Sequence, residues 1–175
     1  MSRIHICSLQ RVESLAAEIQ PSHMLSLLGD VSYFPPTPKG VNVANHLKVN
    51  LADIATPQHG MITPGVDHVA EVIAFGRRWA AETDGTRPLL VHCFAGISRS
   101  TASALMIACA LRPTTRETRL ADALRAASAS AQPNTLMIEH ADELLTRDGR
   151  LIDAVADMGM GDFSQAGQPF VLALG

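Results

Sequence analysis

The spacing of hydrophobic and polar residues divides most of the 175-residue chain into short strands and amphipathic helices. Short hydrophobic runs predict strands over 4–9, 23–28, 45–51 and 89–92. Apolar residues that recur every three or four positions predict helices over 11–19, 65–82, 100–111, 120–127, 134–145 and 151–158. This alternation indicates an α/β fold with a central, mostly parallel sheet of four to five strands flanked by helices.

Three segments break this pattern. The stretch YFPPTPKG at 33–40 cannot be regular, because its three prolines remove backbone donors. The stretch DIATPQHGMITPG at 53–65 has the length, glycine and proline content of a loop that can close over a ligand. The tail at 159–175 is glycine-rich and then apolar, so we expect an edge strand or a partner contact. The length fits a single domain over 1–175.

Composition excludes several classes of protein. A formal net charge of −3 predicts no nucleic-acid partner and no anionic membrane surface, so any bound anion must be held by a local device. The apolar run at 101–111 is about half as long as the ~20 residues of a membrane span. The N-terminus has no signal-peptide pattern. Three cysteines without a CxxC pair indicate a reducing, cytoplasmic location without a disulfide framework or a zinc site.

The sequence LLVHCFAGISRST at 89–101 carries the clearest chemistry. Cys93 ends a predicted strand, and Arg99 opens a predicted helix beyond a short loop. Amides in such a turn, together with the helix N-terminus, can form an anion cradle that favours a cysteine thiolate. Arg99 can bind two phosphoryl oxygens at once. Ser100 can stabilise the thiolate by a hydrogen bond, and His92 can orient the loop. We expect the sulfur to face the mouth of the domain, not its core.

This motif, HC-x5-R-S in its fuller form HCFAGISRST, resembles the phosphate-binding loop of cysteine-dependent protein tyrosine phosphatases. The Ser98-Arg99-Ser100 ending resembles the dual-specificity branch, and residues 41–145 resemble small bacterial phosphatases of this type. The resemblance implies a dual-specificity phosphatase-like fold, a Cys93 nucleophile, a cysteinyl-phosphate intermediate and no metal or organic cofactor. The phosphoryl group would be held by Arg99 and by the loop amides of Phe94, Ala95, Gly96, Ile97, Ser98 and Arg99.

Such a reaction needs an acid to protonate the leaving oxygen, and an aspartate on an upstream loop does this in the family. Asp53 is the candidate, because it follows strand 45–51 as Cys93 follows strand 89–92. One right-handed crossover would make these strands parallel and bring their carboxyl ends to one edge of the sheet. Asp67 at a helix start and Asp30 after an earlier strand are the alternatives. We interpret His59 as a solvated loop residue that could contact substrate.

Several roles stay open. Asn134 is either an ordinary helix N-cap or, by the resemblance, a brace for the phosphate loop. Cys109 and Cys7 fit the core, although a regulatory disulfide between Cys7 and Cys93 is an alternative. The motif could also be a buried cysteine with an arginine helix cap, or belong to a rhodanese-like domain.

The substrate is less constrained than the chemistry. The neutral residues Phe94, Ala95 and Ile97 favour a singly phosphorylated substrate, phosphotyrosine first, over a polyphosphate. We therefore expect a phosphorylated protein or peptide as partner, and phosphate, sulfate or vanadate as ligands of the loop. A phosphatase for a small phosphoester such as an inositol phosphate, or a non-catalytic phosphopeptide-binding module, is the alternative. The oligomeric state is open.

Overall fold

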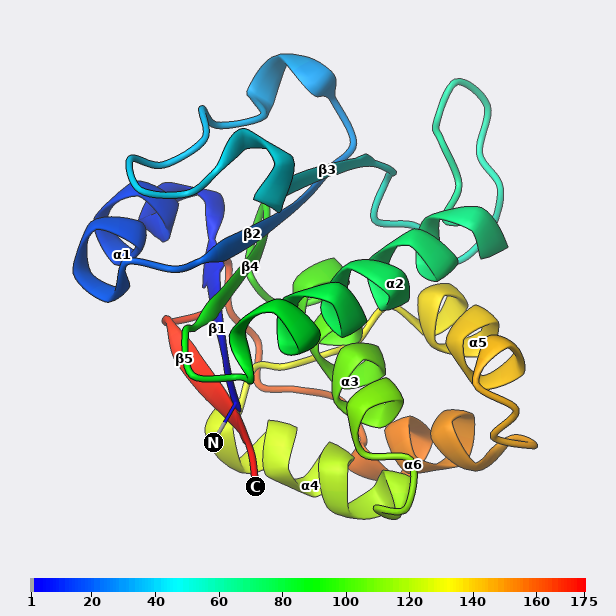
Figure 1. The fold of residues 1–175 in the computed structure, drawn as a ribbon. Helices are drawn as coiled ribbons and strands as arrows, with labels where there is room; N and C mark the ends of the chain where they lie inside the picture. The colour runs from blue at the N-terminus through cyan, green and yellow to red at the C-terminus, as the bar shows by residue number, and fades with distance from the viewer. Residues whose placement is uncertain (1) are drawn as a thin grey trace.

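The computed structural model describes residues 2–175 and contains one five-stranded sheet (Figure 1). The strands are β1 (Ser2–Ser8), β2 (His23–Leu28), β3 (His46–Asn50), β4 (Leu89–Cys93) and β5 (Phe170–Leu174). Their order is β3-β2-β4-β1-β5, and only β5 runs antiparallel to its neighbour. The predicted, mostly parallel sheet is therefore confirmed, and the tail supplies an edge strand.

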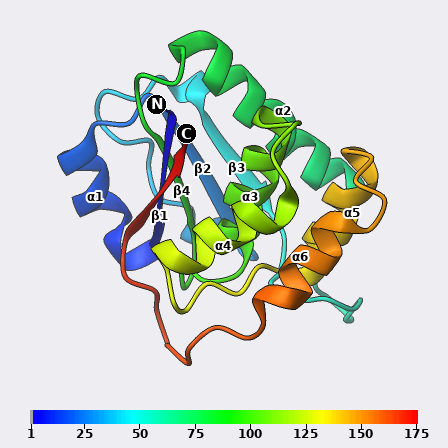
Figure 2. The ribbon, with the colours of Figure 1, turned by 90° about the horizontal axis from the view of Figure 1, so that it is seen from below.

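Helices cover both faces of the sheet unequally (Figures 1 and 2). They are α1 (Val12–Ile19), α2 (Val66–Thr83), α3 (Arg99–Leu111), α4 (Glu117–Ala127), α5 (Thr135–Leu144) and α6 (Arg150–Met158). α1 packs alone on one face, in a small cluster with Cys7 and Leu90. The main core lies on the other face, among residues of β1–β5 and α2–α6.

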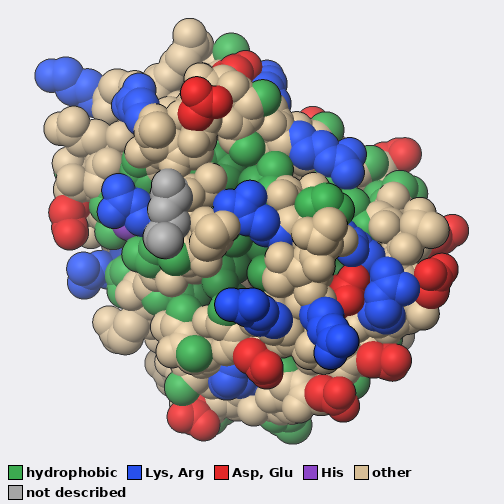
Figure 3. All heavy atoms as spheres, turned by 60° about the horizontal axis from the view of Figure 1, so that its bottom comes forward, with side chains coloured by type: hydrophobic (Ala, Val, Ile, Leu, Met, Phe, Trp, Pro, Cys, Tyr) green, Lys and Arg blue, Asp and Glu red, His purple; other side chains and the backbone are tan. Residues whose placement is uncertain are grey.

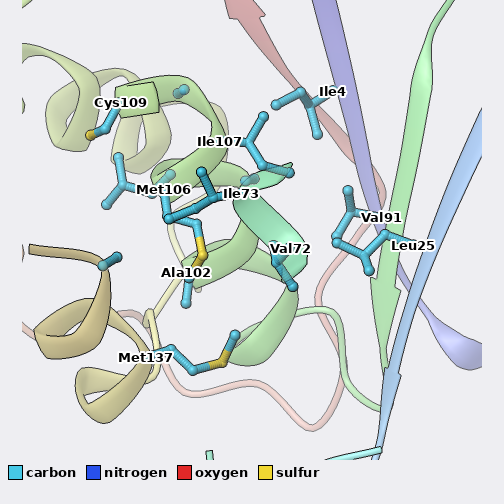
Figure 4. Packing of buried hydrophobic residues seen from close by; sticks show 14 of the residues in the cluster. Ile4, Leu25, Val72, Ile73, Val91, Ala102, Met106, Ile107, Cys109 and Met137 are labelled. Atoms are coloured by element: carbon cyan, nitrogen blue, oxygen red, sulfur yellow. The ribbon is translucent and has the colours of Figure 1, made fainter. Parts of the chain in front are cut away.

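The central element of the main core is α3, whose residues 99–109 are all buried (Figure 4). α2 packs closely against it, because Gly76 presents no side chain to Ile107: a Cβ at Gly76 would lie 2.6 Å from Cγ1 of Ile107. The predicted helix over 100–111 is thus confirmed. This burial fixes the position of the first turn of α3, where Arg99 lies, relative to the end of β4.

The parallel strands end at one edge of the sheet, and the segments that follow them gather there. Ligands bind at this edge in open α/β sheets.

On the underside of the molecule, basic and acidic side chains are interspersed (Figure 3). No helix among residues 2–175 combines the length and hydrophobicity required to cross a membrane.

Candidate active site

The candidate site forms where β4 ends and α3 begins. The amide of Gly96 donates a hydrogen bond of 3.2 Å to Sγ of Cys93, and Oγ of Ser100 lies 3.2 Å from the same sulfur. Cys93 is only 1% exposed and contributes to the main core. Its thiol therefore lies at the base of the loop, deeper than the position at the domain mouth that the sequence predicts.

Gly96 allows the loop to turn tightly over the end of β1. Its φ of +74° is in the left-handed region, and a Cβ there would lie 2.6 Å from the carbonyl carbon of Cys7 and 2.7 Å from the amide of Ser8. Only glycine meets both conditions without strain. The contact brings the Gly96 amide into line with the Cys93 sulfur.

Backbone donors from outside the loop hold its carbonyl groups. Three backbone amides donate to loop carbonyls: Leu9 N to Phe94 O at 3.0 Å, Gly167 N to Ala95 O at 2.8 Å, and Gln132 N to Ile97 O at 3.0 Å. The N–H and C=O of one peptide unit point in opposite directions. Carbonyls that point outward therefore leave the amides of the following residues directed into the loop, where they can form an anion-binding nest.

Arg99 places a buried positive charge beside this nest. Its side chain is 7% exposed, and one terminal nitrogen donates to the carbonyl of Leu51 at 2.9 Å. Among residues 2–175, Nε of Arg99 has no hydrogen-bond partner, although Oδ2 of Asp53 lies 4.0 Å away. A buried, charged donor without an acceptor is costly, so this nitrogen is suited to an anionic ligand.

Asp53 reaches the same place from the loop after β3. Its Oδ1 accepts hydrogen bonds from Oγ of Ser98 at 2.6 Å and from Nδ2 of Asn134 at 3.0 Å. Since both donors use Oδ1, Oδ2 is left facing Arg99. The structure thus brings Asp53, Ser98 and Arg99 together across β2, which separates β3 from β4 in the sheet.

Asn134 has two roles, and its side chain does not brace the phosphate loop directly. Oδ1 caps α5 by accepting from the Met137 amide at 3.1 Å, while Nδ2 donates to Asp53 and to the carbonyl of Ile54 at 3.2 Å. Only its backbone amide reaches the phosphate loop, at the carbonyl of Ser98 (3.4 Å). The side chain therefore secures the loop that carries Asp53.

The alternative acids are placed less favourably. Asp30 lines the cleft that Asp53 and Arg99 also line, but the hydroxyl and amide of Ser32 bind its carboxylate and hold its pKa below the ordinary value. Asp67 is exposed in the first turn of α2 and does not line this cleft. His59 is exposed in the loop between β3 and α2, also outside the cleft lining.

The cleft above Arg99 has a volume of about 360 Å³ and an apolar rim. Tyr33, Met61 and Phe94 line it, and each is more than half exposed. Arg99 is the only basic residue among the described residues that line it. The sequence identifies Phe94 through the motif, but Tyr33 and Met61 carry no local signal of a role at the site.

His92 lies behind the loop and does not reach the cleft. It is fully buried, with Nε2 at 2.6 Å from Oγ of Ser26 and Nδ1 at 3.3 Å from the carbonyl of Cys93. Burial lowers the pKa of His92 to about 4. Burial, with a smaller contribution from the charge of Lys48, also lowers the pKa of His46 to about 4. Both imidazoles are therefore neutral near pH 7.

The other two cysteines are core residues. Burial raises the pKa of Cys7 and of Cys109 to about 12, so both remain protonated thiols. Cys7 packs with α1, whereas Cys93 contributes to the core on the other face, and the strand register pairs Cys93 with Ser8. This arrangement does not favour a disulfide between Cys7 and Cys93.

Within residues 2–175, no three His, Cys, Asp or Glu side chains form a potential metal site.

The two buried histidines make stability depend on pH. The folded protein protonates them only near pH 4, whereas the unfolded chain takes up these protons near pH 6.5. The unfolded state therefore binds more protons in this interval, and the free energy of unfolding should fall as pH falls from about 6.5 to about 4.

Urea unfolding at fixed ionic strength measures this effect. His46→Gln, which cannot titrate, should give a shallower decline between pH 6.5 and 5, above the range in which most carboxylates titrate. Equal slopes for wild type and His46→Gln would contradict the prediction.

Comparisons with solved structures identify the fold of this chain. No family model and no curated protein matches the sequence. Among solved structures, DUSP15 matches with a TM-score of 0.62 and 18% identity, covering 93% of this chain and 94% of that chain. Human DUSP28 matches with a TM-score of 0.62 and 16% identity, over 82% of this chain and 88% of that one. A mouse protein described as a dual-specificity phosphatase, solved with zinc tungstate, matches with a TM-score of 0.57 and 17% identity over 85% and 84%. The chain therefore has the dual-specificity phosphatase-like fold that the sequence predicts.

Proposed function

We propose that this protein is a phosphomonoester hydrolase that acts through a cysteinyl-phosphate intermediate, with phosphotyrosine in a protein or peptide as its first candidate substrate. The observation that carries the proposal is Nε of buried Arg99, which has no hydrogen-bond partner among residues 2–175 and follows a loop whose Gly96 amide donates to the Cys93 sulfur. An anion that accepts from Arg99 would lie close to Asp53, whose Oδ2 is 4.0 Å from this nitrogen. The tungstate complex of the mouse protein with the same fold supports an oxyanion ligand.

The residues suggest a two-step reaction. The Cys93 thiolate attacks phosphorus, so that a P–S bond forms as the ester P–O bond breaks, and Asp53 gives its proton to the leaving oxygen. Asp53, now a carboxylate, then takes a proton from the water that attacks phosphorus. The P–S bond breaks, inorganic phosphate leaves, and Ser100 stabilises the returning thiolate. Arg99 and the loop amides hold the phosphoryl oxygens in both steps.

Asp53 suits this alternation of roles. The two hydrogen bonds that position its carboxyl group both reach Oδ1, which leaves Oδ2 to carry the transferred proton.

Replacing the nucleophile tests the reaction itself. Cys93→Ser should reduce turnover of an aryl phosphate by at least about a thousandfold, because a serine hydroxyl at this position has no base to activate it. Cys109→Ala, at a buried core thiol, is the control and should retain activity per folded molecule. Orthovanadate should inhibit the wild-type protein. Tight binding of a phosphopeptide without turnover would instead support a non-catalytic binding module.

Replacing the acid tests Asp53. Asp53→Ala should lower kcat by about a hundredfold, while vanadate affinity changes little because Arg99 and the loop remain. The loss should grow with the basicity of the leaving alcohol, since a poorer leaving group needs the proton more. Asp67→Ala is the control. If Asp67→Ala or Asp30→Ala shows this dependence on the leaving group instead, Asp53 is not the acid.

The rim of the cleft tests the substrate class. Tyr33, Met61 and Phe94 favour an aryl group, and a single basic residue does not suit a polyphosphate. Phosphotyrosine peptides should be hydrolysed faster than phosphoserine peptides or inositol polyphosphates in a direct comparison.

Phe94→Ala should raise KM for an aryl phosphate by roughly fivefold. Phe163→Ala, which removes an exposed aromatic ring outside the cleft lining, should leave KM unchanged. Preference for an inositol polyphosphate would overturn this assignment while leaving the cysteine chemistry intact.

A further inference from the structure

Four side chains form a continuous hydrogen-bonded row behind the phosphate loop, on the α1 side of the sheet. Oγ1 of Thr37 lies 2.9 Å from Nδ1 of His46, and Nε2 of His46 lies 2.8 Å from Oγ of Ser26. The same oxygen lies 2.6 Å from Nε2 of His92, whose Nδ1 lies 3.3 Å from the carbonyl of Cys93. The row crosses β3, β2 and β4 and connects the proline-rich segment to the candidate nucleophile.

The chemistry of the groups fixes the direction of every bond in this row. A carbonyl can only accept, so Nδ1 of His92 must carry hydrogen, and Nε2 of the neutral ring must accept from the Ser26 hydroxyl. Having donated its hydrogen, Ser26 must accept from Nε2 of His46. Nδ1 of His46 then accepts from the hydroxyl of Thr37. The two histidines are therefore held as opposite tautomers.

Burial and charge keep the row in this state near neutral pH. Ser26 and His92 are fully buried and His46 is 9% exposed, so an unpaired polar atom would be costly at any of them. The titratable and charged groups that influence the rings are Lys48 at His46, and His46 and Arg99 at His92, and all of them oppose a second proton. A protonated His92 would also lose its ability to accept from Ser26.

The end of this row completes the outward orientation of the loop carbonyls. Backbone amides from outside the sheet hold the carbonyls of Phe94 and Ala95, and Nδ1 of His92 lies within hydrogen-bond distance of the carbonyl of Cys93. If that carbonyl rotated toward the cleft, the amide of Phe94 would turn away, and a negative dipole would face the sulfur and the phosphoryl oxygens. The geometry of the nest therefore depends on which nitrogen of His92 carries hydrogen.

We propose that Thr37, His46 and Ser26 are positioning residues that fix His92 in its Nδ1–H form and thereby hold the Cys93 carbonyl away from the bound anion. The proposal rests on the proposed phosphatase function of this loop. The hydrogen-bonded row also connects the phosphate loop to the segment that follows Tyr33, a residue of the cleft rim. In this proposal, a displacement of that segment at Thr37 alters the peptide unit of Cys93.

The tautomers can be measured without any turnover. In ¹⁵N-histidine-labelled protein at pH 7, long-range ¹H–¹⁵N spectra should show hydrogen on Nδ1 of His92 and on Nε2 of His46, with signals assigned by His92→Gln and His46→Gln. Hydrogen on Nε2 of His92, or a doubly protonated ring, would overturn the proposal. Correct tautomers in a protein that neither turns over aryl phosphate nor binds vanadate would instead refute the proposed function.

Breaking the row tests its effect on the loop. Ser26→Ala should mix the tautomers of His92 and lower both kcat/KM for an aryl phosphate and vanadate affinity by about three- to tenfold, the effect of one lost hydrogen bond. His46→Leu should act similarly, whereas His46→Gln retains an N–H donor for Ser26 and should recover most of the loss.

A change in unfolding free energy alone, with the His92 tautomer and vanadate affinity unchanged, would show that the row is merely structural and overturn the proposal. Should Ser26→Ala fail to fold, Thr37→Val removes only the hydroxyl at the half-buried outer end of the row. It should shift the Nδ1 resonance of His46 and weaken vanadate binding by a smaller factor. An unchanged resonance would contradict the direction assigned to the row.

Discussion

A backbone loop can hold a phosphoryl dianion only if its carbonyl oxygens are bonded elsewhere. In this protein that requirement is met from several directions: the segment after β1 bonds Phe94, the tail bonds Ala95, and His92 bonds Cys93. Because Leu9 and Gly167 lie far from this loop in sequence, the orientation of its carbonyls is a product of the whole fold. A peptide with the same loop sequence would not have it.

The order of the strands explains how these contacts meet. β4 lies between β1 and β2, so the loop after β4 has the end of one strand on each side. On the β1 side, the loop backbone packs against the end of β1 at Gly96, where a side chain would collide with the backbone of Cys7. On the β2 side, Ser26 pairs with His92 in register and carries the hydrogen-bonded row outward. Packing against backbone on one side and hydrogen bonding on the other thus fix a loop that has little regular structure of its own.

Features set by local interactions could be predicted from the sequence. Helix and strand positions follow from hydrophobic spacing, and the N-cap at Asn134 follows from its side chain and the helix after it. Asp53 could be placed near the loop that follows β4, where it contacts Ser98, because parallel strands end at one edge of a sheet.

Contacts that depend on strand order could not be predicted in this way. Ser26 is a small polar residue in a short apolar strand, and nothing near it in sequence indicates two histidine partners. The bond from Gly167 to Ala95 was equally hidden, although an edge strand in the tail was expected. The second contact of Asn134, to Asp53, depends on how α5 packs and not on the capping signal.

The charges at the site also show why Asp53 and the loop must be positioned together. Arg99 is buried, its Nε has no hydrogen-bond partner among the described residues 2–175, and its nearest counter-charge there is Asp53 at 4.0 Å. If Asp53 were closer, a bidentate ion pair would satisfy Arg99 and compete with a phosphoryl group for the same donors. If Asp53 were much farther away, it could not supply the proton in the proposed reaction. Ser98 and Asn134 hold the carboxyl group by Oδ1 between these limits, so two neutral donors keep the proposed acid near Arg99 without placing it in the proposed anion site.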